Sequence, residues 1–111
     1  MDNPSPDNGF LVFVTSGSRE EATRIAEALV GERLAACVSV LPGVRSTYRW
    51  RGTIHRDDEV LLIAKTAGAR VEAVRARVRA LHSYETPEIA AIPIAAADPD
   101  WLAWLRVESA S

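Results

Sequence analysis

The chain has 111 residues, 48% of them hydrophobic and 25% charged, which is the composition of one globular domain rather than of a disordered chain. Its formal net charge is −2, with both signs spread along the chain, so a basic surface for nucleic acid is excluded. No apolar run approaches the roughly 20 residues that cross a bilayer, and a single cysteine excludes an internal disulfide. A cytoplasmic protein without membrane or nucleic-acid partners is therefore expected.

The first eight residues are rich in Pro, Asn, Asp and Ser and lack the basic and apolar stretches of a signal peptide. A disordered tail is predicted for 1–8, followed by a single domain at 9–108. The apolar run 10–15 lies between glycine- and serine-containing segments, which is typical of a central strand buried on both faces.

A helix is predicted next, because Ser18 and Glu21 have the spacing of a capping box. In that motif each side chain bonds a free backbone amide at the helix start. Apolar residues then recur every third or fourth position over 22–30, which is the period of one helix face. The apolar run 34–41 that follows is predicted to be the second strand.

A long hairpin is predicted after this strand. Pro42-Gly43 is interpreted as a bulge, beyond which 44–50 alternates, with Tyr48 and Trp50 on one face. Arg51-Gly52 is a plausible two-residue turn, because glycine accepts the positive φ that such turns need. The return strand reaches residue 66, so each arm has about 14–16 residues against a usual five or six. The tip is expected to project beyond the sheet.

A second helix is predicted from Gly68 onward, because valines and leucine share one side of it up to position 81. Pro87 ends that region, 88–94 is predicted to be an edge strand, and Asp98-Pro99 starts a C-terminal helix. The order β-α-β-β-α-β plus a helix predicts an α+β domain with a ferredoxin-like sandwich.

Few residues in the sequence point to chemistry. Cys37 lies inside an apolar strand, where a free thiol usually acts as a small hydrophobe. His82 is followed by Tyr84, Glu85 and Glu88, which offers an imidazole and two carboxylates to a divalent cation, against the simpler reading of a helix-end histidine. Lys65 ends the third strand as a cation that can face a ligand.

Two further patterns bear on function. Tyr48 and Trp50 lie where a lone hairpin cannot bury them, which is typical of a partner surface. An acylphosphatase-like hydrolase needs a catalytic asparagine, and the only asparagines are Asn3 and Asn8 in the tail, so that enzyme class ranks last. No phosphate-binding loop motif is present.

Several segments together resemble the CutA family of divalent-cation tolerance proteins. They cover about 10–105, and the resemblance depends on their order and spacing. In chain order they are Leu34-Ala35-Ala36-Cys37-Val38, Pro42-Gly43, Ser46-x-Tyr48-x-Trp50-x-Gly52-x-Ile54, Glu59, Leu61-Leu62-Ile63-Ala64-Lys65-Thr66, His82-x-Tyr84-Glu85-x-Pro87-Glu88-Ile89 and Trp101-Leu102-x-Trp104.

The resemblance implies a homotrimer without an enzymatic activity, linked to tolerance of Cu2+ and other divalent cations. It places Tyr48 and Trp50 in the trimer interface and a weak metal or small-ligand site at the subunit cleft. Cys37, Lys65 and Tyr84 are expected to line that cleft. The first-strand cysteine proposed as a copper ligand in some members is Val14 here. A signalling protein of the PII kind, which binds a small anionic ligand, is the alternative.

Overall fold

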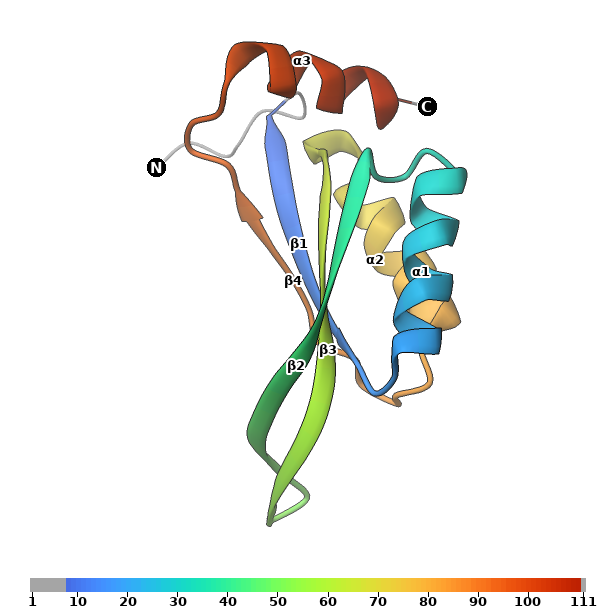
Figure 1. Cartoon of the computed structure of the whole chain (residues 1–111), viewed down its shortest axis with the longest axis vertical. Coiled ribbons are helices and arrows are strands. Elements are labelled where there is room, and N and C mark those ends of the chain that lie inside the picture. The colour runs from blue at the N-terminus through green and yellow to red at the C-terminus, as the bar shows by residue number, and fades with distance from the viewer. Residues whose placement is uncertain (1–7, 111) are drawn as a thin grey trace.

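The computed structural model describes residues 8–110 as a four-stranded sheet with two helices on one face and a third helix across its end (Figure 1). The strands lie in the order β2-β3-β1-β4 and every neighbouring pair is antiparallel. The ferredoxin-like α+β architecture predicted from the sequence is confirmed. In chain order the elements are β1 (Gly9–Ser16), α1 (Arg19–Gly31), β2 (Cys37–Trp50), β3 (Thr53–Ala67), a 3₁₀ turn (Gly68–Arg70), α2 (Val71–Leu81), β4 (Ile89–Pro93) and α3 (Pro99–Glu108).

Two boundaries differ from the sequence prediction by three residues, and the predicted tail falls outside the described residues except for Asn8. The second strand begins at Cys37 rather than Leu34, because the amides of Leu34 and Ala35 both donate to the carbonyl of Leu29, at 2.9 and 3.1 Å, and close the end of α1. The segment from Gly68 forms a 3₁₀ turn before α2 begins. Within residues 8–110 no helix is long and apolar enough to cross a membrane.

The hairpin of β2 and β3 extends past the helices, as its length predicts (Figure 1). The pairing of Trp50 with Thr53 leaves Arg51 and Gly52 as the turn, both with positive φ (50° and 81°). Two positive φ values are what the tightest hairpin turns require. The predicted two-residue turn is therefore confirmed.

The core lies between the sheet and the two helices α1 and α2. Ile25 and Leu29 of α1 are fully buried against a cluster that includes Val12, Val14 and Leu62 of the sheet. The other side of the sheet carries no helix except α3 at its end, where Leu102 and Leu105 lie against Gly9, and we call it the open face. Its side chains in β1, β2, β3 and β4 are Leu11, Phe13, Thr15, Cys37, Ser39, Leu41, Leu61, Ile63, Lys65, Ala90 and Ile92.

Replacing Gly52 by alanine is expected to lower the free energy of unfolding by about 1 kcal/mol, because a Cβ is strained at its φ of +81°. The matched control is Gly31→Ala at the end of α1, where a Cβ has no neighbour within 4 Å. That change should be neutral or stabilising. Urea unfolding at equal protein concentration measures both, and a Gly52→Ala chain as stable as the parent would contradict the turn assignment.

Candidate functional site

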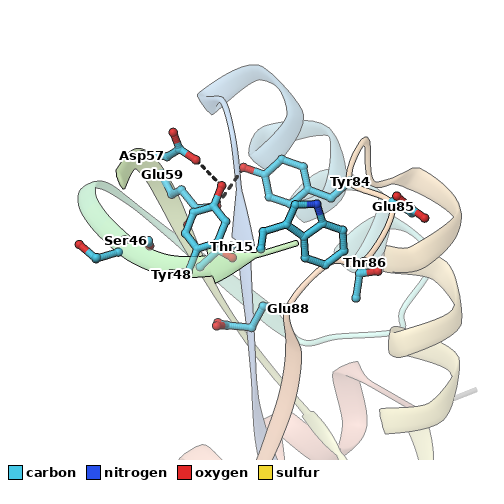
Figure 2. Close-up of a pocket in the computed structure, with 11 residues that line it drawn as sticks. Thr15, Ser46, Tyr48, Asp57, Glu59, Tyr84, Glu85, Thr86 and Glu88 are labelled. Carbon is cyan, nitrogen blue, oxygen red and sulfur yellow. Dashed lines mark hydrogen bonds between the residues drawn. The ribbon is translucent and has the colours of Figure 1, made fainter. Parts of the chain in front are cut away.

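A cavity of about 610 Å³ opens where the hairpin leaves the domain (Figure 2). Its walls come from the hairpin, from β1 and from the loop between α2 and β4. We call it the hairpin pocket. The residues that line it are Thr15, Ser46, Thr47, Tyr48, Trp50, Asp57, Glu59, Tyr84, Glu85, Thr86 and Glu88.

Two tyrosine–carboxylate pairs form the inner part of the pocket (Figure 2). The Tyr84 hydroxyl donates to Glu59 Oε2 at 2.9 Å, and the Tyr48 hydroxyl donates to Asp57 Oδ2. The hydrogen bond to Asp57 raises the pKa of Tyr48, while burial, with Glu59 beside it, raises the pKa of Tyr84. Both phenols therefore remain protonated donors at neutral pH, and the pocket presents carboxylates between aromatic rings.

The mouth of the pocket carries two further carboxylates with different surroundings. Glu85 Oε2 pairs with Arg51 at 3.0 Å, and the Arg51 guanidinium lies 5.3 Å from the centre of the Trp50 ring. Glu88 is exposed and makes no hydrogen bond or ion pair with any residue of 8–110. Apart from the Arg51 pair at its mouth, the pocket is therefore negatively charged.

His82 is the C-cap of α2, as the helix-end interpretation of the sequence expects. Its side chain is fully buried, and Nε2 is 2.6 Å from the Thr15 carbonyl oxygen, while Nδ1 accepts from the Tyr84 amide at 3.0 Å. A carbonyl can only accept and an amide can only donate, so the ring is neutral with its proton on Nε2. Both nitrogens are thus occupied within the fold.

Glu21 is the second buried polar group of this region, and it corrects the capping-box prediction. Ser18 Oγ accepts from the Glu21 amide at 3.2 Å as predicted, but the Glu21 carboxylate does not return to the Ser18 amide. It accepts from Ser16 Oγ at 2.7 Å and from the Ser83 amide at 3.0 Å instead. Glu21 therefore joins the start of α1 to the loop that follows α2, across 62 residues of sequence.

This junction positions Tyr84 at the pocket. A Cβ added to Gly17 would lie 3.1 Å from the Tyr84 hydroxyl oxygen, so the ring rests against the turn between β1 and α1. The His82 and Tyr84 rings also contact each other, with centroids 4.6 Å apart. The buried Glu21 and His82 thus fix the wall from which Tyr84 reaches Glu59.

The three predicted metal ligands do not lie close together in the single chain. His82 is buried with both nitrogens bonded, and the carboxylates of Glu85 and Glu88 point in different directions (Figure 2). Among residues 8–110, no three His, Cys, Asp or Glu side chains form a group that could hold a metal ion. A metal site built from these three residues stays a prediction, and it requires His82 to give up a hydrogen bond.

Two of the three residues expected to line a cleft lie away from the hairpin pocket. Lys65 Nζ is 3.6 Å from Cys37 Sγ and bonds Ser39 Oγ, further along the open face. Tyr84 does line the pocket. Tyr48 and Trp50, predicted for a trimer interface, are 41% and 40% exposed in the single chain.

The pocket residues that sequence reasoning missed are Asp57 and Glu59. They alternate along β3 and face Ser46 and Val44 across the hairpin, which puts them on the side of Tyr48 and Trp50. The sequence shows that Asp57 and Glu59 share one face of their strand. Which face this is relative to Tyr48 depends on the register of the hairpin, and the bulge sets that register.

Replacing Glu21 by glutamine is expected to destabilise the fold at about pH 7 by about 1–3 kcal/mol, because a buried charge-assisted acceptor is lost. Burial raises the pKa of Glu21, but hydrogen bonds from Ser83 and Ser16 outweigh it, and the pKa ends below its ordinary 4.5. The carboxylate therefore stabilises the fold above its unfolded pKa, and this contribution is lost as pH falls through the lower folded pKa.

Urea unfolding from about pH 7 to about pH 3 measures the difference in the free energy of unfolding between the parent and Glu21→Gln. This difference should become smaller below about pH 4.5. Glu20→Gln, an exposed change in the same helical turn, is the control. A Glu21→Gln chain whose deficit is the same at both ends of the range would contradict the account.

The comparisons with known proteins agree with this fold. The family model described as CutA1 divalent ion tolerance protein matches residues 10–108. The divalent-cation tolerance protein CutA of Thermus thermophilus is 49% identical over 96 residues, covering 86% of this chain and 93% of the relative. The chloroplastic protein CutA of Arabidopsis thaliana is 41% identical, and there the chain spans about half of the relative, 53% of its length.

Solved structures of CutA proteins have the same fold as this chain. The CutA1 structure from Thermus thermophilus superposes with a TM-score of 0.89 at 46% identity, covering 92% of this chain and 99% of the other. The CutA structure from Xylella fastidiosa has a TM-score of 0.91 at 41% identity, covering 93% and 99%. The chain therefore belongs to the CutA family of divalent-cation tolerance proteins.

Proposed function

We propose that the chain acts in divalent-cation tolerance as a cytoplasmic homotrimer without enzymatic activity. The observation that carries the assembly is the open face, which stays uncovered in the single chain and continues onto the hairpin. Leu41 and Ile92 are 41% and 48% exposed there, and Tyr48 and Trp50 extend the same side of the molecule. Large contiguous apolar surfaces are typical of interfaces rather than of free monomers.

The sheet edges support the same proposal. β2 and β4 are the outer strands, so each presents unpaired backbone groups that another copy can pair with. Three is the copy number that the family resemblance implies. A hairpin with arms of 14 and 15 residues also has too little core of its own, and packing on a neighbour stabilises it.

The cation site is proposed at the cleft between subunits. One chain supplies carboxylates at the mouth of the hairpin pocket, Glu85 and Glu88, but no complete set of three ligands within residues 8–110. Ligands from two copies complete such a set only in the trimer. With Val14 on the first strand there is no thiolate to select Cu(I), so nitrogen and oxygen donors favour Cu2+.

The charge of the pocket supports a cation over the alternative of a small anionic ligand. Asp57, Glu59, Glu85 and Glu88 all line it, and within residues 8–110 only Glu85 is paired with a cation. An anion would be repelled from such a cavity. The absence of enzymatic activity is likewise proposed from the site, because both nitrogens of His82 are held by backbone groups and act on no nucleophile.

The trimer is tested by light scattering coupled to gel filtration, where we expect three times the chain mass of 12.1 kDa. Trp50→Ala should raise the concentration at which the assembly dissociates by at least about tenfold, because large interface aromatics dominate association. Val30→Ala, an exposed change on the helix side, is the control and should leave the mass unchanged. A parent chain that elutes as a monomer at micromolar concentration would overturn the proposal.

Cation binding is tested by calorimetric titration of the trimer with Cu2+ and Mg2+. We expect saturable Cu2+ binding, negligible Mg2+ binding, and a weakening of at least about tenfold in Glu88→Gln, following the Irving–Williams order for nitrogen and oxygen ligands. His82→Gln tests whether the ligands of the cation include the His82 imidazole or are carboxylates alone. If it weakens Cu2+ binding as much as Glu88→Gln, while the trimer stays intact, the imidazole is a ligand. No saturable Cu2+ binding by the parent would remove the cation site.

A further inference from the structure

The hairpin of β2 and β3 has two chemically different faces. Beyond the bulge, Ser46, Tyr48 and Trp50 share a face with Asp57 and Glu59, and this face forms the hairpin pocket. The residues between them point to the opposite side. That side carries Arg45 and Arg49 on β2, paired with Asp58 and Ile54, and Arg56 on β3, paired with Thr47, which also borders the pocket.

Two arginines on this second face have no partner within the described chain. Arg45 is paired with Asp58 at 3.0 Å, but neither Arg49 nor Arg56 makes a hydrogen bond or ion pair with residues 8–110. They are diagonal neighbours on the same face, which places them roughly 7–8 Å apart at Cα. Both are exposed. We call Arg49 and Arg56 the arginine pair.

The rim of the hairpin pocket already holds one guanidinium. Arg51 lies over the Trp50 ring at 5.3 Å and pairs with Glu85 at 3.0 Å. This combination of an aromatic face and a carboxylate is how proteins bind arginine. The contact that Arg51 makes within the chain therefore shows that this surface can bind a guanidinium group. Glu88 at the same mouth has no partner among residues 8–110.

We propose that in the homotrimer the hairpin of each copy places its arginine pair on the hairpin pocket of the next copy. The pocket is then completed by guanidinium groups of a neighbour, with Glu88 and Asp57 as acceptors and Tyr48 as the aromatic wall. The inference rests on the homotrimer of the proposed function. It names the chemistry that joins one hairpin to the next.

A second copy fits the pocket better than a bare metal ion or a free small molecule. The two complementary surfaces lie on opposite faces of one ribbon, so each copy donates to one neighbour and accepts from another. Such head-to-tail contacts close into a ring when the rotation permits. A metal ion needs three ligands close together, which residues 8–110 of one copy do not hold, so it too would depend on groups from a neighbour. A guanidinium pair, by contrast, can reach carboxylates that lie apart.

The test reverses the charge of the arginine pair in the full chain. Light scattering on dilution measures the dissociation midpoint, the protein concentration at which half of the trimer has dissociated. Arg49→Glu with Arg56→Glu should raise that midpoint by at least about tenfold, because like charges replace a partly buried ion pair. Arg24→Glu is the matched control and should change it little, because Arg24 of α1 is exposed and has no partner among residues 8–110. If the double reversal unfolds the chain, as judged by circular dichroism, Arg49→Gln with Arg56→Gln replaces it.

Rescue identifies the acceptor. Adding Glu88→Arg to the double reversal puts a positive charge at position 88 opposite the negative charges at positions 49 and 56. This change should recover most of the affinity between copies that the double reversal loses. A double variant no weaker than Arg24→Glu, or one that Glu88→Arg does not improve, overturns the arginine contact and leaves the homotrimer standing. A monomeric parent overturns the homotrimer itself, and the contact with it. Spermidine that binds the parent trimer, and binds less to Asp57→Asn, shows an open pocket and also overturns the contact.

Discussion

One extra residue in β2 decides which way the hairpin faces. Leu41 pairs with Leu61 and Val44 pairs with Glu59, so β2 advances three residues while β3 advances two. Side chains alternate along a strand, so this step moves the even-numbered residues of β2 to the open face. Without it, Tyr48 and Trp50 would point to the helix side. Gly43, with a φ of +86°, provides the conformation that the step needs.

The hairpin alone would not make a pocket, because its second wall belongs to the loop after α2. Glu21 and His82 hold that loop against the turn after β1, each through hydrogen bonds to backbone groups far away in sequence. A buried carboxylate is costly unless its oxygens are bonded, and here both oxygens have donors. The same bonds that satisfy Glu21 therefore also set the position of Tyr84 opposite Glu59.

The local parts of the fold could be predicted from the sequence, because their causes are local. The Arg51-Gly52 turn, the Ser18 cap and the Asp98-Pro99 helix start each depend on residues that are neighbours along the chain. The site could be predicted only in part. Spacing alone suggested that the Glu21 carboxylate would cap its own helix and that His82 could join Glu85 and Glu88 at a cation. The Glu21 carboxylate instead accepts from the Ser83 amide and the His82 ring bonds the Thr15 carbonyl, and these partners are neighbours only in space. Asp57 and Glu59 were missed for the same reason.

The proposed cation site and the proposed arginine contact share one carboxylate, and this has a thermodynamic consequence. A divalent cation on Glu88 and a neighbour's guanidinium on Glu88 exclude each other. Binding of the cation then weakens the arginine contact by the same factor by which that contact weakens cation binding, while the ligands that two copies give the cation join those copies. Such reciprocity needs no moving element in the chain. The occupancy of Glu88 would then decide which of the two contacts joins neighbouring copies, and the free-energy balance between them would shift with the logarithm of the free cation concentration above its dissociation constant.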